Sequence, residues 1–121
     1  MCDRPMTKTT LLQNDEDLQA MLERSEQEAV LLLKHSNSCP ISSAGYRQFE
    51  AVAERDYPMY MVVVQEARAV SNAIAEQLNV FHQTPQAIIV HQGKAVFDLS
   101  HYRIRTDALT SEMDRLAGSG A

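Results

Sequence analysis

Two short, uninterrupted apolar runs constrain the fold of this chain more than any other feature. They occupy residues 29–33 and 59–64, and the stretch between them, residues 40–53, repeats its apolar side chains at helical spacing. Continuous apolar runs of this length are typical of strands that are covered on both faces. Because a helix separates the two strands, we expect them to be parallel and joined by a right-handed crossover.

Caps, turns and spacing define the remaining elements. They are a helix opening at residues 14–17, a helix over about 68–79, strands at 86–91 and 95–99 joined by a turn at Gln92 and Gly93, and a last helix capped by Thr106 and Asp107. Strands joined by such a tight turn are antiparallel. The sequence therefore predicts an α/β protein with a mixed central β-sheet flanked by helices on both faces, the layout of the thioredoxin-like fold.

Length and charge set further limits. The 121 residues fit one domain, which we place at residues 9–117 between an N-terminal tail, 1–8, and a C-terminal tail, 118–121. A net charge of -5 disfavours nucleic acid as a partner. The apolar runs are far shorter than the roughly 20 residues that cross a bilayer. The first ten residues contain no apolar segment of the secretory kind, so we expect a cytoplasmic protein without a membrane partner.

One of the two cysteines stands at a position that favours chemistry. Cys2 lies in the predicted tail, and in a reducing cytosol we expect no bridge between it and Cys39. Cys39 directly precedes Pro40, and proline is favoured at the first position of a helix. Cys39 would then be the N-cap residue, where the free amides of the first turn and the positive end of the helix favour the thiolate.

The residues around Cys39 indicate a monothiol mechanism. Ser42 occupies the position that a resolving cysteine takes in a C-x-x-C motif, so an external thiol must release whatever Cys39 accepts. Ser42 either donates a hydrogen bond to the sulfur or is a plain first-turn residue. A cysteine can also be a small buried apolar residue, but the polar segment 35–38 before it favours an exposed loop.

Four segments in this order resemble the monothiol bacilliredoxins, the YtxJ-like family. They are Lys-His-Ser-Asn-Ser-Cys-Pro-Ile-Ser at 34–42, Val-Gln-Glu-Ala-Arg at 64–68 with Ser71 and Asn72, Thr-Pro-Gln-Ala at 84–87, and Ser100 with His101. The resemblance covers about residues 11–106. One departure is small, since Ser38 stands where the family usually has threonine and the hydroxyl is kept.

The resemblance implies a thioredoxin-like oxidoreductase without a permanently bound cofactor. Its co-substrate would be bacillithiol or a similar low-molecular-weight thiol, which it removes from mixed disulfides on S-thiolated cytosolic proteins. Bacillithiol carries carboxylates, which need cationic or N–H donors. The candidates for substrate binding are Lys34, His35, Ser38, Arg68 and His101, and the charged ones among them fit solvated surface groups equally well.

Thr84 and Pro85 resemble the cis-proline element that faces the reactive cysteine in thioredoxin-like proteins. A cis bond would leave the backbone groups of Thr84 free to pair with a bound substrate. An ordinary trans proline at the start of a strand is the alternative. The predicted site therefore comprises Cys39, Pro40 and Ser42 as the catalytic group, with Thr84 and Pro85 on the substrate side.

Three other functions are alternatives for the same residues. The four histidines, His35, His82, His91 and His101, lack the spacings of a zinc site, so no metal is expected. A second class is an iron–sulfur carrier, in which Cys39 would supply one thiolate per chain, although Pro40 stiffens the loop where a cluster must fit. A third is a non-catalytic binding module, which would keep its binding after a Cys39→Ser substitution.

Overall fold

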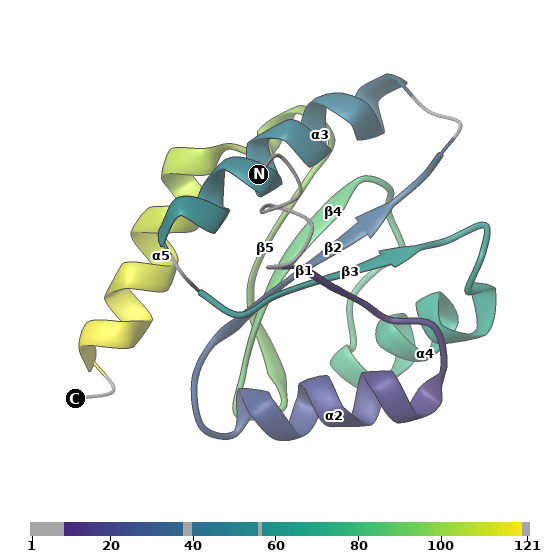
Figure 1. Cartoon of the computed structure of the whole chain (residues 1–121), viewed down its shortest axis with the longest axis horizontal. Helices are drawn as coiled ribbons and strands as arrows, with labels where there is room; N and C mark the ends of the chain where they lie inside the picture. Colours follow the sequence, from purple (N-terminus) through teal and green to yellow (C-terminus); the bar gives the residue numbers. More distant parts are fainter. Residues whose placement is uncertain (1–8, 38–39, 56, 120–121) are drawn as a thin grey trace.

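The computed structural model describes residues 9–37, 40–55 and 57–119 (Figure 1). In chain order the elements are β1 (Thr9–Leu11), α2 (Asp15–Ser25), β2 (Val30–His35), α3 (Pro40–Ala51), η1 (Val52–Arg55), β3 (Met59–Val63), α4 (Arg68–Leu78), β4 (Gln86–His91), β5 (Lys94–Ser100), η2 (His101–Arg103) and α5 (Thr106–Ser119).

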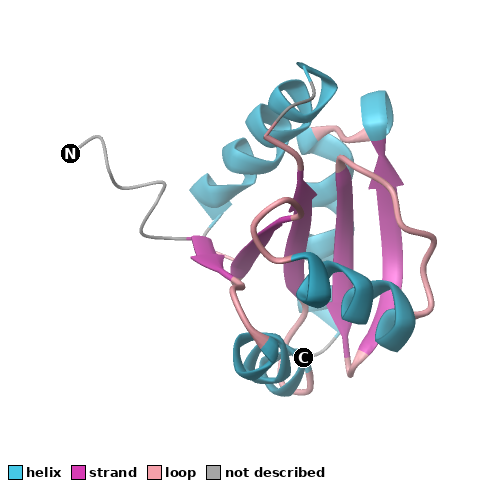
Figure 2. Ribbon diagram, turned by 90° about the vertical axis from the view of Figure 1, so that its right-hand side faces the viewer, coloured by secondary structure: helices cyan, strands magenta, loops and turns pink. Residues whose placement is uncertain are grey.

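The strands form one mixed sheet in the order β1-β3-β2-β4-β5. β2 lies at its centre and is parallel to β3 and antiparallel to β4, while β4 and β5 form the predicted antiparallel pair. Helices α2 and α4 cover one face, and α3 and α5 cover the other (Figures 1 and 2). The predicted arrangement of a mixed sheet flanked by helices on both faces is confirmed.

Strand β2 is buried on both faces, as its continuous apolar run predicts. Val30 and Leu32 belong to the core under α2 and α4. Leu31 and Leu33 alternate with them and pack into the core under α3 and α5. This alternation places the side chain of Lys34 on the α2 and α4 side and that of His35 on the α3 and α5 side.

Most predicted boundaries agree with the structure to within one residue. The Asn14 side chain caps α2 by accepting a hydrogen bond from the Asp17 amide at 2.9 Å, and α3 begins at Pro40. The turn between β4 and β5 has Gln92 and Gly93 at positive φ, 56° and 74°. No helix in the described part of the chain combines the length and apolarity needed to cross a membrane.

The sequence prediction missed β1, a three-residue edge strand. Thr9 to Leu11 pair in parallel with Met59 to Met61, fifty residues later in the chain. Three residues are too few to show a period, and the pairing that defines this strand is entirely long-range. The first element of the described part of the chain is thus a strand and not, as predicted, the helix that opens at residues 14–17.

Candidate functional site

The candidate site lies where β2 ends, α3 begins and β4 begins. Cys39 and Ser38, the predicted nucleophile and its neighbour, lie outside the described residues, so their roles remain predictions. The elements on either side of them are described: β2 ends at His35, and α3 begins at Pro40. Cys39 therefore directly precedes the first residue of a helix, as the sequence predicts.

Pro85 closes this end of the sheet against α3. The Thr84–Pro85 peptide bond is cis, which confirms the prediction. The proline ring is buried, and a Cβ atom added to Gly45 in α3 would lie 3.0 Å from its Cγ and 3.2 Å from Cδ1 of Ile104. Helix α3 thus approaches Pro85 closely because residue 45 has no side chain.

At this point Thr84 is more accessible than the ring of Pro85. Thr84 is half-buried, and its backbone forms no hydrogen bond within the described residues. The carbonyl of Pro85, in contrast, accepts a hydrogen bond from the His101 amide at 3.0 Å. The exposed side chain of His101 therefore lies beside the same corner of the fold, on η2.

Ser42 has a buried hydroxyl without a partner. Its side chain is fully buried in the first turn of α3, three residues after Cys39, and its Oγ makes no hydrogen bond in the described structure. Buried polar atoms are nearly always satisfied, and those that are not often belong to functional sites. The hydroxyl is therefore available as a donor to a group that arrives at the start of α3.

His35 lies on the same side of the sheet as Ser42. Its ring packs at 5.6 Å between centroids against Tyr46 of α3, and its Nδ1 is buried without a hydrogen-bond partner among the described residues. Burial lowers the pKa of His35, so the ring is neutral at pH 7. The positive charge that the sequence suggests for this residue is therefore absent at neutral pH.

Gln65 holds the loop that leads to Cys39, a role that the sequence analysis did not assign. Its Nε2 donates to Ser36 Oγ at 2.7 Å, and its Oε1 accepts from the Asn37 amide at 3.1 Å. Asn37 Nδ2 also reaches Glu66 at 3.5 Å. The available signal in the sequence was the pair of polar residues, Gln65 and Glu66, that comes after the buried strand β3. The residues that they bind, Ser36 and Asn37, lie about thirty positions earlier in the chain.

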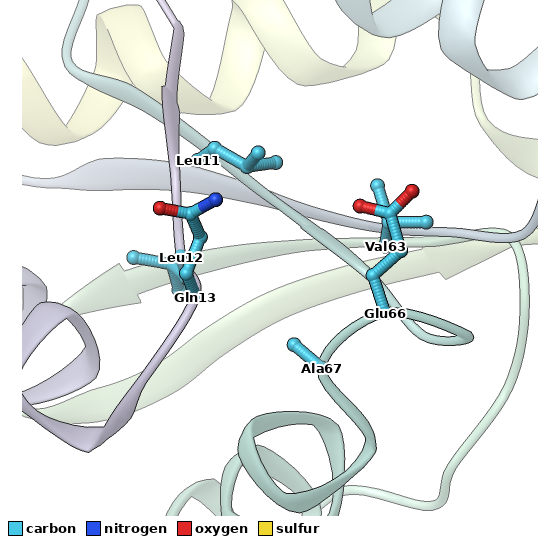
Figure 3. Close-up of a pocket in the computed structure, with 6 residues that line it drawn as sticks. All are labelled: Leu11, Leu12, Gln13, Val63, Glu66 and Ala67. Carbon is cyan, nitrogen blue, oxygen red and sulfur yellow. The ribbon is translucent and has the colours of Figure 1, made fainter.

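Glu66 also lines a small cavity beside β1. The cavity has a volume of about 60 Å³ and lies between residues 11–13 and Val63, Glu66 and Ala67 (Figure 3). Sites for small molecules usually enclose about 300–1,000 Å³. This cavity is therefore smaller than a usual small-molecule site, and we do not assign substrate binding to it.

Lys34 differs most from its sequence-based interpretation. Its side chain is fully buried, so it is not the solvated or substrate-facing cation that the sequence suggests. Its Nζ lies 2.7 Å from His82 Nδ1 and 3.5 Å from the carbonyl oxygen of Ser71. Burial lowers the pKa of Lys34 to about 8. In this position the ammonium cannot touch a carboxylate of a bound thiol.

The predicted site residues thus fall on two sides of the sheet. His35, Ser42 and Pro85 lie towards α3, with His101 beside them. Lys34 lies towards α4, together with Arg68, which is exposed at the first position of that helix and whose charge helps to lower the pKa of His82. No cluster of three or more potential metal ligands occurs within residues 9–37, 40–55 and 57–119.

Comparison with known proteins agrees with this geometry. A family model described as monothiol bacilliredoxin BrxC matches residues 10–109. A solved structure of a thioredoxin-fold protein, provisionally described as an oxidoreductase, is 32% identical with a TM-score of 0.80, covering 88% of this chain and 95% of that one.

Thioredoxins from two organisms share the fold at low identity. The Malassezia sympodialis protein is 11% identical with a TM-score of 0.70 and 90% coverage of both chains. The Fasciola hepatica protein is 16% identical with a TM-score of 0.69, covering 88% of this chain and 98% of that one. At these identities the likeness concerns the fold alone.

Proposed function

This chain belongs to the monothiol bacilliredoxin family BrxC, and on that premise we propose that it removes bacillithiol, or a similar low-molecular-weight thiol, from mixed disulfides on cytosolic proteins. Family membership and the thioredoxin fold support a thiol redox function and oxidoreductase activity in general. The finer assignment rests on one observation: helix α3 begins at Pro40, directly after the only cysteine of the predicted domain.

The proposed reaction proceeds in two exchanges. The Cys39 thiolate attacks the bacillithiol sulfur of the mixed disulfide, and the client cysteine leaves as a thiolate that takes a proton from water. Cys39 then carries bacillithiol in a mixed disulfide. A second low-molecular-weight thiolate attacks the bacillithiol sulfur, releasing Cys39 as a thiolate and forming the disulfide of the two small thiols.

We assign the client side of the site to Thr84. Its unpaired backbone groups can bond to an extended client segment in the manner of an added strand. For the carboxylates of the small thiol, Arg68 and His101 remain candidates because both are exposed. Ser38 and His35 stay candidates for substrate binding, whereas burial removes Lys34 from direct contact.

The direct test uses a protein that carries bacillithiol on one cysteine. The Cys2→Ser variant should release that client at the wild-type rate and gain the mass of one bacillithiol on Cys39. The Cys39→Ser variant should show no release above the uncatalysed rate. In the wild-type protein, an unmodified Cys39 together with a modified Cys2 would count against the proposal, and so would equal rates for the two variants.

Ser42 provides a second prediction about the same sulfur. If its unpartnered hydroxyl donates to the Cys39 thiolate, the Ser42→Ala variant should raise the pKa of Cys39 by about one to two units, since a hydrogen bond to a charged group contributes about 1.5–3 kcal/mol. The measurement is the rate of iodoacetamide alkylation against pH, made in a Cys2→Ser background. Removal of an unsatisfied hydroxyl should not lower stability, so an unchanged alkylation profile would identify Ser42 as a plain helix residue.

A further inference from the structure

Lys34 is a buried charge for which the proposed exchange reaction has no use. Among the described residues it is the only Asp, Glu, Lys or Arg that is fully buried. It stands in the central strand, paired with Val62 of β3 on one side and with Gln86 of β4 on the other. An apolar residue would fill this place without the penalty of removing an ammonium group from water.

Its hydrogen-bond partners are neutral. No carboxylate forms an ion pair with Lys34 within the described residues. Burial and the nearby charges of Lys34 and Arg68 lower the pKa of His82, so the ring is neutral at pH 7. Lys34 Nζ therefore donates to His82 Nδ1 at 2.7 Å, and the ring proton of His82 resides on Nε2.

The contact ties down the segment that leads to Pro85. Helix α4 ends at Leu78 and β4 begins at Gln86, so residues 79–85 lead from the helix layer on one face into the sheet. His82 is held from the α4 side by Lys34, and Pro85 is held from the α3 side by the close approach of Gly45. Thr84, whose backbone forms no hydrogen bond within the described residues, lies between these two anchors along the chain.

Ser71 completes the anchor on the α4 side. Its carbonyl oxygen lies 3.5 Å from Lys34 Nζ, and its Oγ lies 3.5 Å from His82 Nδ1. Helix α4, strand β2 and the segment 79–85 therefore meet at one ammonium group. A charged group that is carried by one element and forms hydrogen bonds to two others defines their relative positions more sharply than an apolar contact would, because hydrogen bonds are directional.

We propose that Lys34 and His82 form a positioning pair that sets the backbone of Thr84 for client binding. The pair touches neither the client nor the reacting sulfurs, and it acts through the chain between His82 and Thr84. This inference rests on the proposed function, because the role of the pair is in recognition of the client protein. The ionisation of Cys39 is attributed to the start of α3 and does not depend on the pair.

A matched pair of variants isolates the hydrogen bond. His82→Asn and His82→Leu introduce side chains of nearly equal size at an exposed position, but only asparagine offers an acceptor to Lys34. We expect His82→Leu to raise the KM for a bacillithiol-carrying client about tenfold, as loss of a charged hydrogen bond allows. The kcat and the alkylation rate of Cys39 should stay within twofold, and His82→Asn should retain most of the client affinity.

A second measurement does not depend on turnover. The backbone amide resonances of Thr84 and Gln86 should shift, and their hydrogen exchange should accelerate, in His82→Leu but not in His82→Asn. If wild type itself fails to release the client, the proposed function fails, and the amide measurement alone then decides the positioning role. Unchanged amides in His82→Leu, an unchanged KM in an active enzyme, or equal impairment of both variants would overturn the inference.

Discussion

Replacing Lys34 by methionine should raise the free energy of unfolding at pH 7 by about 1–2 kcal/mol. Burial lowers the pKa of Lys34 from 10.5 to about 8, which corresponds to a penalty of about 3 kcal/mol for holding the charged form inside the fold. The lost hydrogen bonds to His82 and Ser71 offset about 1–2 kcal/mol of this gain. Methionine fills nearly the same volume, so no large cavity results.

The pH dependence identifies the origin of the effect. Between about pH 8 and 10.5 the unfolded chain holds the Lys34 proton and the folded protein does not, so raising the pH favours the folded state of wild type. The Lys34→Met variant lacks this group. The stability difference between the two proteins should therefore be largest below pH 8 and should shrink steadily as the pH rises to 9.5.

Urea unfolding at pH 7.0, 8.0, 9.0 and 9.5 measures this difference, with Leu32→Met as the matched control. Leu32 stands two residues earlier on the same face of the same strand and is equally buried. Its substitution should lower stability by less than about 1.5 kcal/mol, by an amount that does not change with pH. A Lys34→Met protein that is less stable than wild type at pH 7 would show that the ammonium stabilises the fold.

Together with the positioning role, this result would separate stability from function at one residue. A Lys34→Met protein that is more stable but binds its client more weakly would mean that the lysine is kept for the geometry of segment 79–85 and not for folding. Proteins commonly carry such destabilising groups at functional sites, where an apolar residue would serve the fold better.

Local rules explain which parts of this structure the sequence could predict. Pro40 fixes the start of α3 because proline suits the first helical position, and Gly93 supplies a positive φ for the turn after β4. The order of strands and helices then determines a mixed sheet with parallel and antiparallel parts. Strand β1 escaped prediction because it exists only through its pairing with β3.

The site was less predictable for the same reason. Two-sided burial of β2 follows from its apolar run, and continuing that run by one residue would have placed Lys34 inside. Its acceptor, His82, lies 48 positions away in a loop whose path no local pattern specifies. Sequence reasoning can therefore find residues that carry chemistry near Cys39, whereas buried partners contributed by distant loops require the fold.

Adding a side chain at Gly45 should lower both stability and client release. A methyl group there would lie 3.0 Å from Cγ and 3.1 Å from Cβ of Pro85, and 3.2 Å from Cδ1 of Ile104. The pyrrolidine ring cannot change rotamer to make room, and its carbonyl is held by the His101 amide. We expect overpacking to exceed the gain in helix propensity of about 1 kcal/mol, with a net loss of about 1–2 kcal/mol for Gly45→Ala and about 3 kcal/mol for Gly45→Val.

Two further variants separate steric pressure from helix propensity. Ser43 is exposed in the same helix, so Ser43→Ala should leave stability unchanged or slightly raised. Ile104→Val removes Cδ1, one of the three crowding atoms, so the double variant with Gly45→Ala should be more stable than the sum of the single losses by about 0.5–1 kcal/mol. Urea unfolding gives these values. Strict additivity, or a Gly45→Ala protein more stable than wild type, would mean that Pro85 can move away from α3, and the position of Thr84 would then depend on Lys34 and His82 alone.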